Sequence, residues 1–374
     1  MNFDTRAISI SLVILATIGV FYVLVVGKAF LVPLAVALMI WYVINAMSRS
    51  YVKLIPWVKQ PNWLSMTLAI FSIGLFIALT VDLVQNNVAN VQQSIPKYRD
   101  NFNALSTKVG EMLPTQALEN LPELSDLLQG IEFAPLLTTF TDNVVAMISN
   151  VTLVLIYVAF MLAEQGTFRK KISTIFPDQA NRGSVMSILV HAQEDIQTYL
   201  WIKSLTSTLT GLISYFVLRM VDVDFAAFWA FSIFMLNFIP TVGSIIATLF
   251  PAMLALIQFD TLIPFFVVLI GVGSIQLIVG NVLEPKLMGN TLNVSPFVVM
   301  MSLTLWGSIW GIAGMFLSVP ITVMMLIVFA HFDRTRYIAV LLSGDGSLKF
   351  AKQVEKTLIE IKAEDGEDRE ENEK

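Results

Sequence analysis

The stretch Leu236-Asn237-Phe238-Ile239-Pro240-Thr241-Val242-Gly243-Ser244 lies inside a hydrophobic tract that covers residues 225–257. A proline three residues before a glycine cannot continue an ordinary helix without disruption. A bilayer offers no water to the backbone groups freed by such a break, so the break must be buried in protein or line a cavity. Secondary transporters often bind solute at broken helices near the bilayer midplane. The stretch therefore predicts a solute pathway, with Pro240 and Gly243 as the break.

The composition predicts an all-α, polytopic helical membrane protein. The chain has 374 residues, of which 56% are hydrophobic and 14% charged, and its mean hydropathy is +0.74. A soluble domain carries roughly 25% charged residues. The apolar residues come in blocks of about 20, the length that crosses a bilayer as a helix. We expect about seven to eight membrane segments, accompanied by amphipathic helices outside the membrane.

Several chemistries have no residues to support them. The chain contains no cysteine, which excludes disulfides and thiolate ligands. His191 and His331 lie far apart in the sequence, so we expect no metal site. No nucleophile–base–acid set, nucleotide fingerprint or basic patch with interleaved aromatics is recognisable. We therefore expect no enzymatic activity, no cofactor and no nucleic-acid partner.

The hydropathy pattern divides the chain into six parts. Three membrane helices come first, and a polar helical insert outside the membrane follows them. A fourth membrane helix, a set of cytoplasmic amphipathic helices, a transport core with broken helices, and a cytoplasmic helix with an acidic disordered tail complete the chain. The predicted boundaries are, in order, 1–84, 85–142, 143–164, 165–200, 201–332 and 333–374.

Basic residues near the span ends set the predicted orientation, because they favour the cytoplasmic side. Arg49 and Lys53 put the second loop inside, and Lys203 falls inside with the basic run at residues 169–171. Arg334 and Arg336 close the membrane region on the same side. We therefore expect both termini in the cytoplasm of a bacterial cell, with the chain in the inner membrane.

Two apolar tracts are too long for one membrane span and short for two full spans. The first covers residues 225–257, and the second, residues 296–330, is interrupted by Gly307, Gly311 and Gly314. Two re-entrant helical hairpins that enter from opposite faces would fit both lengths and the predicted orientation. Two pairs of short full spans would preserve the same orientation and remain an alternative.

A carboxylate ends the span between these tracts, in Asn281-Val282-Leu283-Glu284-Pro285-Lys286. Pro285 is expected to stop the helix there. Ionisable residues at membrane depth are expensive and are functional candidates by default, so Glu284 is the first candidate for a solute or ion pathway. The competing interpretation is an interfacial acid paired with Lys286.

Four neutral polar residues are further pathway candidates. Asn237 precedes the break and is expected either to cap freed backbone groups or to contact solute. Gln276 and Asn281 share a span with Glu284 and are predicted to line a polar path, although Gln276 alone would also suit a helix–helix hydrogen bond. Ser244 follows the break and is equally suited to helix packing.

Three motifs together resemble the autoinducer-2 exporter family of bacterial membrane proteins. They are the 236–240 stretch with Gly243, the 281–286 stretch with Met288-Gly289, and Trp306-Gly307 followed by Gly311, Gly314 and Leu317-Ser318-Val319-Pro320. The resemblance covers nearly the whole chain. It implies an inner-membrane transporter without a cofactor, which forms homo-oligomers and exports autoinducer-2 or exchanges sodium or lithium for protons. For an exchanger, the resemblance makes Glu284 the carboxylate that trades a proton for a cation.

Three functions remain open on the sequence. Broken helices with neutral polar residues favour export of a small polar signalling metabolite. A cation/proton antiporter is the alternative, although deep carboxylates are scarce. A membrane scaffold or regulatory protein that uses the polar segments is the third. In each case the lipid bilayer is a partner, and a small polar solute, or a monovalent cation and a proton, is the expected ligand.

Overall fold

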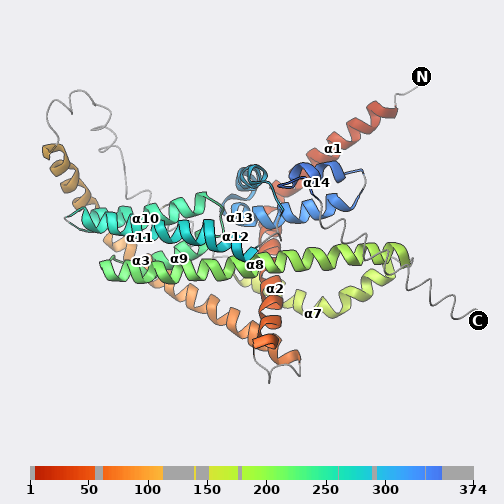
Figure 1. Cartoon of the computed structure of the whole chain (residues 1–374), viewed down its shortest axis with the longest axis horizontal. Helices are drawn as coiled ribbons and strands as arrows, with labels where there is room; N and C mark the ends of the chain where they lie inside the picture. The colour runs from red at the N-terminus through yellow and green to blue at the C-terminus, as the bar shows by residue number, and fades with distance from the viewer. Residues whose placement is uncertain are drawn as a thin grey trace, which may run out of the picture. The chain divides into compact units, whose positions relative to one another are not determined.

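The computed structural model describes residues 5–54, 62–112, 139, 151–175, 179–259, 261–288, 293–332 and 334–347 (Figure 1). In these ranges the regular structure is helical, apart from an isolated bridge between Val294 and Ser343. The prediction of an all-α membrane protein is confirmed. Six helices are long and apolar enough to cross a membrane, over Lys28–Lys53, Trp63–Leu83, Val151–Phe168, Gln193–Val221, Ile263–Met288 and Pro296–Ala330.

The described chain forms two compact units. Unit 1 comprises Met1–Leu54, Val151–Trp201 and Met288–Lys374, and unit 2 comprises Ile55–Asn150 and Ile202–Leu287. The helices of unit 1 are α1 (Thr5–Val26), α2 (Lys28–Leu54), α7 (Val151–Ile175), the first part of α8 (Gln179–Val221), α13 (Pro296–His331) and α14 (Arg336–Leu342). Unit 2 holds α3 (Asn62–Met112), the rest of α8, α9 (Ala226–Leu236), α10 (Val242–Gln258), α11 (Ile263–Ile278), the π-helix η2 (Val279–Leu283) and the start of α12 (Glu284–Met288).

Two helices continue across boundaries that the hydropathy pattern predicts. α3 continues without interruption past residue 84 to Met112, and α8 begins at Gln179 and passes through residues 200 and 201. Most of the predicted insert after residue 112 and the C-terminal amphipathic helix and tail after residue 347 lie outside the described residues. The predicted fourth membrane helix is described from Val151 onward, as α7.

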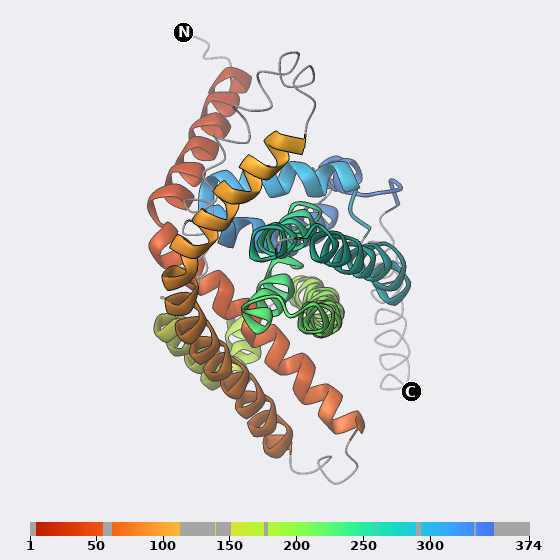
Figure 2. The ribbon, with the colours of Figure 1, turned by 90° about the vertical axis from the view of Figure 1, so that its left-hand side faces the viewer.

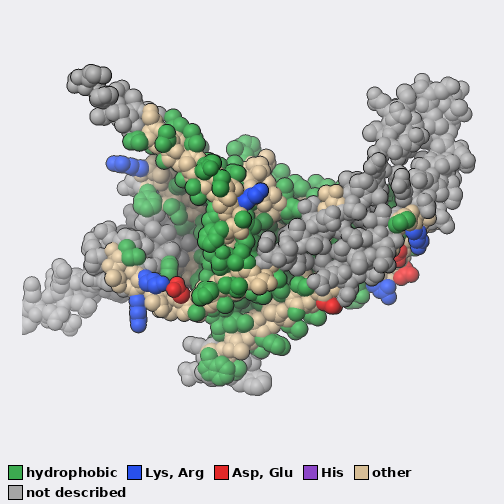
Figure 3. All heavy atoms as spheres, turned by 180° about the vertical axis from the view of Figure 1, so that it is seen from behind, with side chains coloured by type: hydrophobic (Ala, Val, Ile, Leu, Met, Phe, Trp, Pro, Cys, Tyr) green, Lys and Arg blue, Asp and Glu red, His purple; other side chains and the backbone are tan. Residues whose placement is uncertain are grey.

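Large apolar side chains cover much of the described surface, as Figure 3 shows for one face. On α1, Leu15 is 72% exposed, and on α8, Phe216 is 63% exposed. A soluble protein rarely exposes apolar surface on this scale, whereas a helix that faces lipid does so as a rule. These faces therefore suit acyl chains.

The tract at residues 225–257 forms a helical hairpin, here called the first hairpin: α9, α10 and residues 237–241 between them. Trp229 of α9 and Phe250 of α10 lie with ring centroids 6.2 Å apart, so the chain reverses between them. α9 has 11 residues and α10 has 17, which at about 1.5 Å per residue makes both shorter than the roughly 30 Å core of a bilayer.

Side chains close the open end of the first hairpin and tie it to α3. Gln258 accepts a hydrogen bond from the backbone N–H of Asp224 and donates one to the carbonyl of Asp222, each at 2.8 Å. The Tyr98 hydroxyl donates to Asp224 Oδ2 at 2.8 Å, and the Asn101 amide donates to the Ile257 carbonyl at 3.0 Å. Burial and the hydrogen bond to Asp224 raise the pKa of Tyr98, so the phenol keeps the proton it donates.

The tract at residues 296–330 also reverses direction, at Gly311. This glycine has φ 63° and ψ −142°, a conformation essentially closed to other residues. The Ser302 hydroxyl bonds to Thr322 Oγ1 and donates to the Ser318 carbonyl at 3.1 Å. In a straight helix, residues 302 and 322 would be about 30 Å apart. The two arms of α13 on either side of Gly311 are therefore a second hairpin, which is compatible with a re-entrant hairpin and with a pair of short full spans.

The core of unit 1 joins the second hairpin to α2 and α8. Leu317, Val323 and Ile327 pack with Met39 and Ile196, and all five are at least 96% buried. The tip of the second hairpin also meets α1, where the Trp310 indole donates to the Leu24 carbonyl at 3.0 Å. In unit 2, α9 lies beside the second half of α8, which Figure 2 shows nearly end-on.

Candidate functional site

A buried ion pair joins α8 to α12 within unit 2. The Lys203 ammonium donates to both oxygens of Glu284, at 2.7 and 2.8 Å. The two side chains are only 8% and 15% exposed, and both residues lie within helices apolar enough to span a membrane. The partner of Glu284 is therefore Lys203 rather than Lys286, which is exposed. Lys203 belongs to the membrane segment of α8, not to a cytoplasmic loop before it.

A π-helical turn brings Glu284 to this position. In η2 the backbone N–H of Glu284 bonds to the carbonyl of Val279, five residues back, instead of four. The wider turn accommodates the missing N–H and the ring of Pro285, which would clash in a regular helix. The expectation that Pro285 stops the helix is wrong, because α12 continues from Glu284 to Met288. Single π-turns of this kind occur often at functional sites.

A polar face runs along α8 from Lys203. Thr206, Ser207, Thr210 and Ser214 follow it at helical spacing, and each is fully buried. Thr206 and Thr210 donate to carbonyls of their own helix, at 3.1 and 2.8 Å. These bonds satisfy the two hydroxyl protons and leave oxygen lone pairs free to accept a hydrogen bond.

The break of the first hairpin meets this face. The Asn237 amide donates to the Ser207 hydroxyl at 3.0 Å, and Asn237 is 6% exposed. Its side chain thus bonds to a neighbouring helix and not to carbonyls of the break. Ser244 donates to the Thr241 carbonyl at 2.8 Å, so it caps the break itself.

The break also holds backbone strain. Thr241 has φ 58° and ψ −61°, outside the regions that a β-branched residue normally adopts. Such a conformation costs on the order of 1–3 kcal/mol, and the surrounding contacts must hold it. Gly243, two residues later, lies against the other arm, where an added Cβ would be 1.8 Å from the Leu236 carbonyl oxygen. The strain and the close approach both lie at the predicted break.

Three buried polar atoms of unit 2 have no hydrogen-bond partner in the described part of the chain. They are the hydroxyls of Ser214 on α8 and Ser232 on α9, and Nε2 of Gln276 on α11. Their side chains are 0%, 2% and 7% exposed. Buried polar groups are almost always paired, and each unpaired one costs about 1–3 kcal/mol. A solute with several hydroxyl groups has the chemistry to satisfy them.

Not all predicted pathway residues come together. Glu284, Asn237 and Gln276 lie buried or nearly so in unit 2, whereas Asn281 is exposed. Five residues separate Gln276 from Asn281, about 140° of helical rotation, so one face cannot present both. Gly307, Gly311 and Gly314 belong to the second hairpin, in unit 1.

The comparison with known proteins agrees with a transport role. A sequence model for AI-2E family transporters matches residues 10–334. A candidate transport protein of Haemophilus influenzae is 33% identical over 92% of this chain and 97% of its own length. The AI-2 transport protein TqsA of Escherichia coli is 30% identical over 88% and 95%. A more distant relative, YrrI of Bacillus subtilis, is 23% identical over 88% and 96%.

Proposed function

We propose, from the premise that this chain belongs to the AI-2E transporter family, that it exports a small, neutral, hydroxyl-rich metabolite of the AI-2 kind. The chain is a multi-pass membrane transporter. What we propose is the class of solute, the outward direction of transport, and secondary transport that uses no nucleotide. Resemblance to an AI-2 transport protein over nearly the whole chain supports the choice of solute.

The observation that carries the proposal is the set of unpaired polar groups in unit 2. Ser214, Ser232 and Gln276 each bury a hydrogen-bonding atom that the described protein leaves unused. Asn237 and Ser207 bond to each other and could exchange that bond for bonds to solute at little net cost. The set is neutral, with donors and acceptors mixed, which matches hydroxyl groups and not a phosphate or carboxylate.

The Lys203–Glu284 pair has a separate role in this proposal. Within unit 2, it neutralises the two charges that lie nearest the polar face of α8. Breaking a buried pair leaves a costly uncompensated charge, so a movement that parts α8 from α12 needs a compensating interaction. We propose that solute or a proton provides it, which would couple opening of the site to its occupancy.

A cation/proton antiporter is the second candidate, and one observation favours it. Glu284 is a buried carboxylate whose two oxygens are held by a single ammonium group. A sodium or lithium ion could replace that ammonium on the carboxylate, and a proton could neutralise the carboxylate in turn. In this mechanism Lys203 occupies the cation position when no ion is bound.

The membrane arrangement follows from the same proposal. The first hairpin would enter and leave by one face, because its arms are too short to cross the core, and we place the second hairpin in the same way from the opposite face. We place both termini in the cytoplasm of a bacterial inner membrane, as the basic residues favour. Exposed apolar faces on α1 and α8 leave room for contacts with further copies, so we include a homo-oligomer in the proposal.

Flux through the purified full-length chain in sealed liposomes separates the two functions. We expect loaded AI-2 to leave the vesicles without any requirement for sodium or lithium. An antiporter would instead move protons, reported by a pH-sensitive dye, when sodium or lithium is added. Proton movement of that kind without AI-2 flux would replace the first function with the second.

The Gln276→Leu variant tests the site itself. Removing an unsatisfied buried amide without loss of volume is expected to leave stability unchanged or raise it, because no bond is lost. AI-2 flux should nevertheless fall, about tenfold for the loss of one solute hydrogen bond. Asn281→Leu, at an exposed position of the same helix, is the matched control and should retain flux. Normal flux in Gln276→Leu would contradict the assigned site.

A further inference from the structure

A second candidate site lies in unit 1, apart from the groups assigned to transport. It is a half-open pocket of about 470 Å³ between α2, α7 and the first part of α8. Pockets that hold small ligands have volumes of roughly 300–1,000 Å³ and combine apolar walls with a few polar groups. None of its lining residues belongs to either hairpin or to the Lys203–Glu284 pair.

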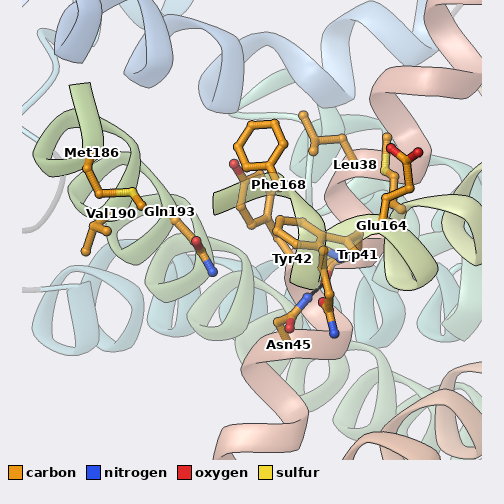
Figure 4. A pocket seen from close by; sticks show the side chains of 11 residues that line it. Leu38, Trp41, Tyr42, Asn45, Glu164, Phe168, Met186, Val190 and Gln193 are labelled. Carbon is orange, nitrogen blue, oxygen red and sulfur yellow. Dashed lines mark hydrogen bonds between the residues drawn. The ribbon is translucent and has the colours of Figure 1, made fainter. Parts of the chain in front are cut away.

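Aromatic rings form one wall of the pocket (Figure 4). Trp41 and Tyr42 of α2 are adjacent, with ring centroids 5.0 Å apart, and Phe168 of α7 lies beside them. Flat rings of this kind offer a broad apolar face on which the C–H face of a small ring compound can pack. The wall therefore favours a flat or cyclic ligand over a flexible chain.

The polar groups of the pocket are amides and one carboxylate. Asn45, Gln165 and Gln193 supply the amides, and Glu164 supplies the carboxylate. Asn45 donates to the Trp41 carbonyl at 2.8 Å, which leaves its own carbonyl oxygen as an acceptor. Among the described residues that line the pocket, none is lysine, arginine or histidine. This set suits hydroxyl groups, which donate and accept, and disfavours phosphates and carboxylates.

Two buried polar groups on the pocket side lack partners in the described chain. The indole N–H of Trp41 is buried and meets no acceptor. Gln197 is one turn beyond Gln193 on the same face of α8, is 2% exposed, and has neither its amide oxygen nor its nitrogen bonded. Buried donors and acceptors are nearly always paired in folded proteins. Of these two residues, Trp41 lines the pocket.

On α2 and α7, basic residues lie beyond the pocket-lining segments, toward the C-terminal end of each helix. Lys53 ends α2, and Lys170 and Lys171 follow Phe168 on α7. This is the end that the positive-inside rule assigns to the cytoplasm. A ligand in the pocket would therefore come from the cell interior, where a solute to be exported is found.

We propose that this pocket is a cytoplasmic binding site for a small hydroxylated ring compound, which captures the transported solute before it reaches unit 2. The inference rests on the proposed function for the identity of that solute, but not for the existence of the site. It predicts that the pocket sets the concentration at which transport saturates, while the groups of unit 2 set the maximum rate.

Binding and flux measured on the same variants test the proposal. The probes are AI-2 and D-ribose as hydroxylated rings and tetramethylammonium as a cation, with the full-length protein in nanodiscs. Trp41→Phe removes the N–H but keeps an aromatic ring, and Gln193→Leu removes an amide at similar volume. Each should weaken AI-2 binding about tenfold and raise the half-saturating concentration for flux by a similar factor, with the maximum rate unchanged. Trp63→Phe, at an exposed position of α3, is the control and should bind as the wild type does.

The outcomes separate this proposal from the transport function. Wild-type binding in both Trp41→Phe and Gln193→Leu, or binding of tetramethylammonium in place of both ring compounds, would overturn the pocket assignment. AI-2 flux with binding that is independent of Trp41 would keep the function and reject the pocket. Binding that depends on Trp41, in a protein that carries no AI-2 flux, would keep the pocket and reject the function.

Discussion

The two hairpins share a shape but differ in where the buried side chains of Ser302 and Asn237 form their hydrogen bonds. In the second hairpin, Ser302 bonds to Ser318 and Thr322, so the hydroxyls join one arm to the other. In the first, Asn237 bonds to Ser207 of α8, outside the hairpin. An interrupted membrane helix is therefore not in itself a solute site. Polar groups that bond inward hold a hairpin together, whereas polar groups directed outward are available to a partner.

The two breaks also differ in how the backbone makes its turn. Gly311 adopts a conformation that suits glycine and stores little strain. The first hairpin has Thr241 at positive φ, where a β-branched residue is strained. Strain that persists in a native structure is often part of a functional site, and it lies in the same hairpin as the outward-directed amide. Both differences support our proposal that the first hairpin handles solute and that the second is structural.

The largest expected effect is a loss of stability, and it should occur in both hairpins. In Gly243→Ala and Gly314→Ala the new Cβ would be 1.8 and 1.9 Å from a backbone carbonyl oxygen of the opposite arm. Backbone on both sides must move, at a cost of about 3 kcal/mol or more, so we expect loss of folded protein in thermal unfolding. Gly74→Ala, where nothing lies within 4 Å, is the control and should unfold as the wild type does. A folded Gly314→Ala at normal temperature would show that the second hairpin is not closely packed.

The next largest effect on stability should have opposite signs in the two hairpins. Gly311→Ala introduces a side chain at a φ/ψ that excludes it, and should destabilise by about 2 kcal/mol. Thr241→Gly relieves strain and should stabilise by up to about 1 kcal/mol, while slowing transport because the strained break no longer favours movement. Unfolding temperatures and flux of both variants check this pair. Thr241→Gly with full flux would make its strain incidental.

Asn237→Ala and Ser302→Ala should separate function from stability. Asn237→Ala removes one buried side-chain hydrogen bond and Ser302→Ala removes two, and each variant should cost about 1–2 kcal/mol. We expect AI-2 flux to fall only in Asn237→Ala, because Ser302 serves the second hairpin alone. Equal loss of flux at matched stability would end the functional distinction between the hairpins.

The smallest effect concerns the closed end of the first hairpin. Tyr98→Phe removes the hydrogen bond to Asp224 but keeps the buried ring, and should cost about 1 kcal/mol. Below the ordinary pKa of tyrosine this loss should not depend on pH, because the raised pKa of Tyr98 keeps the phenol protonated. The difference in unfolding free energy between Tyr98→Phe and the wild type should shrink only as alkaline pH ionises the phenol. Unfolding at neutral and alkaline pH measures it.

Local sequence signals predicted the helices and both interruptions. A proline near a glycine, or three closely spaced glycines, favours a break in helical backbone, so the breaks at Pro240 and Gly311 were predictable from the sequence. Polar residues at helical spacing from Lys203 to Ser214 also indicate the polar face of α8 in the sequence.

The remaining features depend on tertiary contacts. Lys203 and Glu284 are 81 residues apart, and no local pattern pairs them. The π-turn before Pro285 shifts the register of that helix, so the prediction that Pro285 ends it was wrong. The pocket lined by Trp41 and Phe168 comes from three helices whose packing no periodicity specifies.

Exchange of the buried charges tests the central claim most directly, that Glu284 and the polar groups around α8 operate the transporter. The double variant Lys203→Glu/Glu284→Lys keeps an ion pair but moves the carboxylate to α8, whereas each single variant leaves two like charges facing each other. We predict that the double variant recovers the unfolding temperature lost in the single variants while AI-2 flux in liposomes stays below a tenth of the wild-type rate. Wild-type flux in the stable double variant would contradict the account, because the pair would then be a structural contact alone.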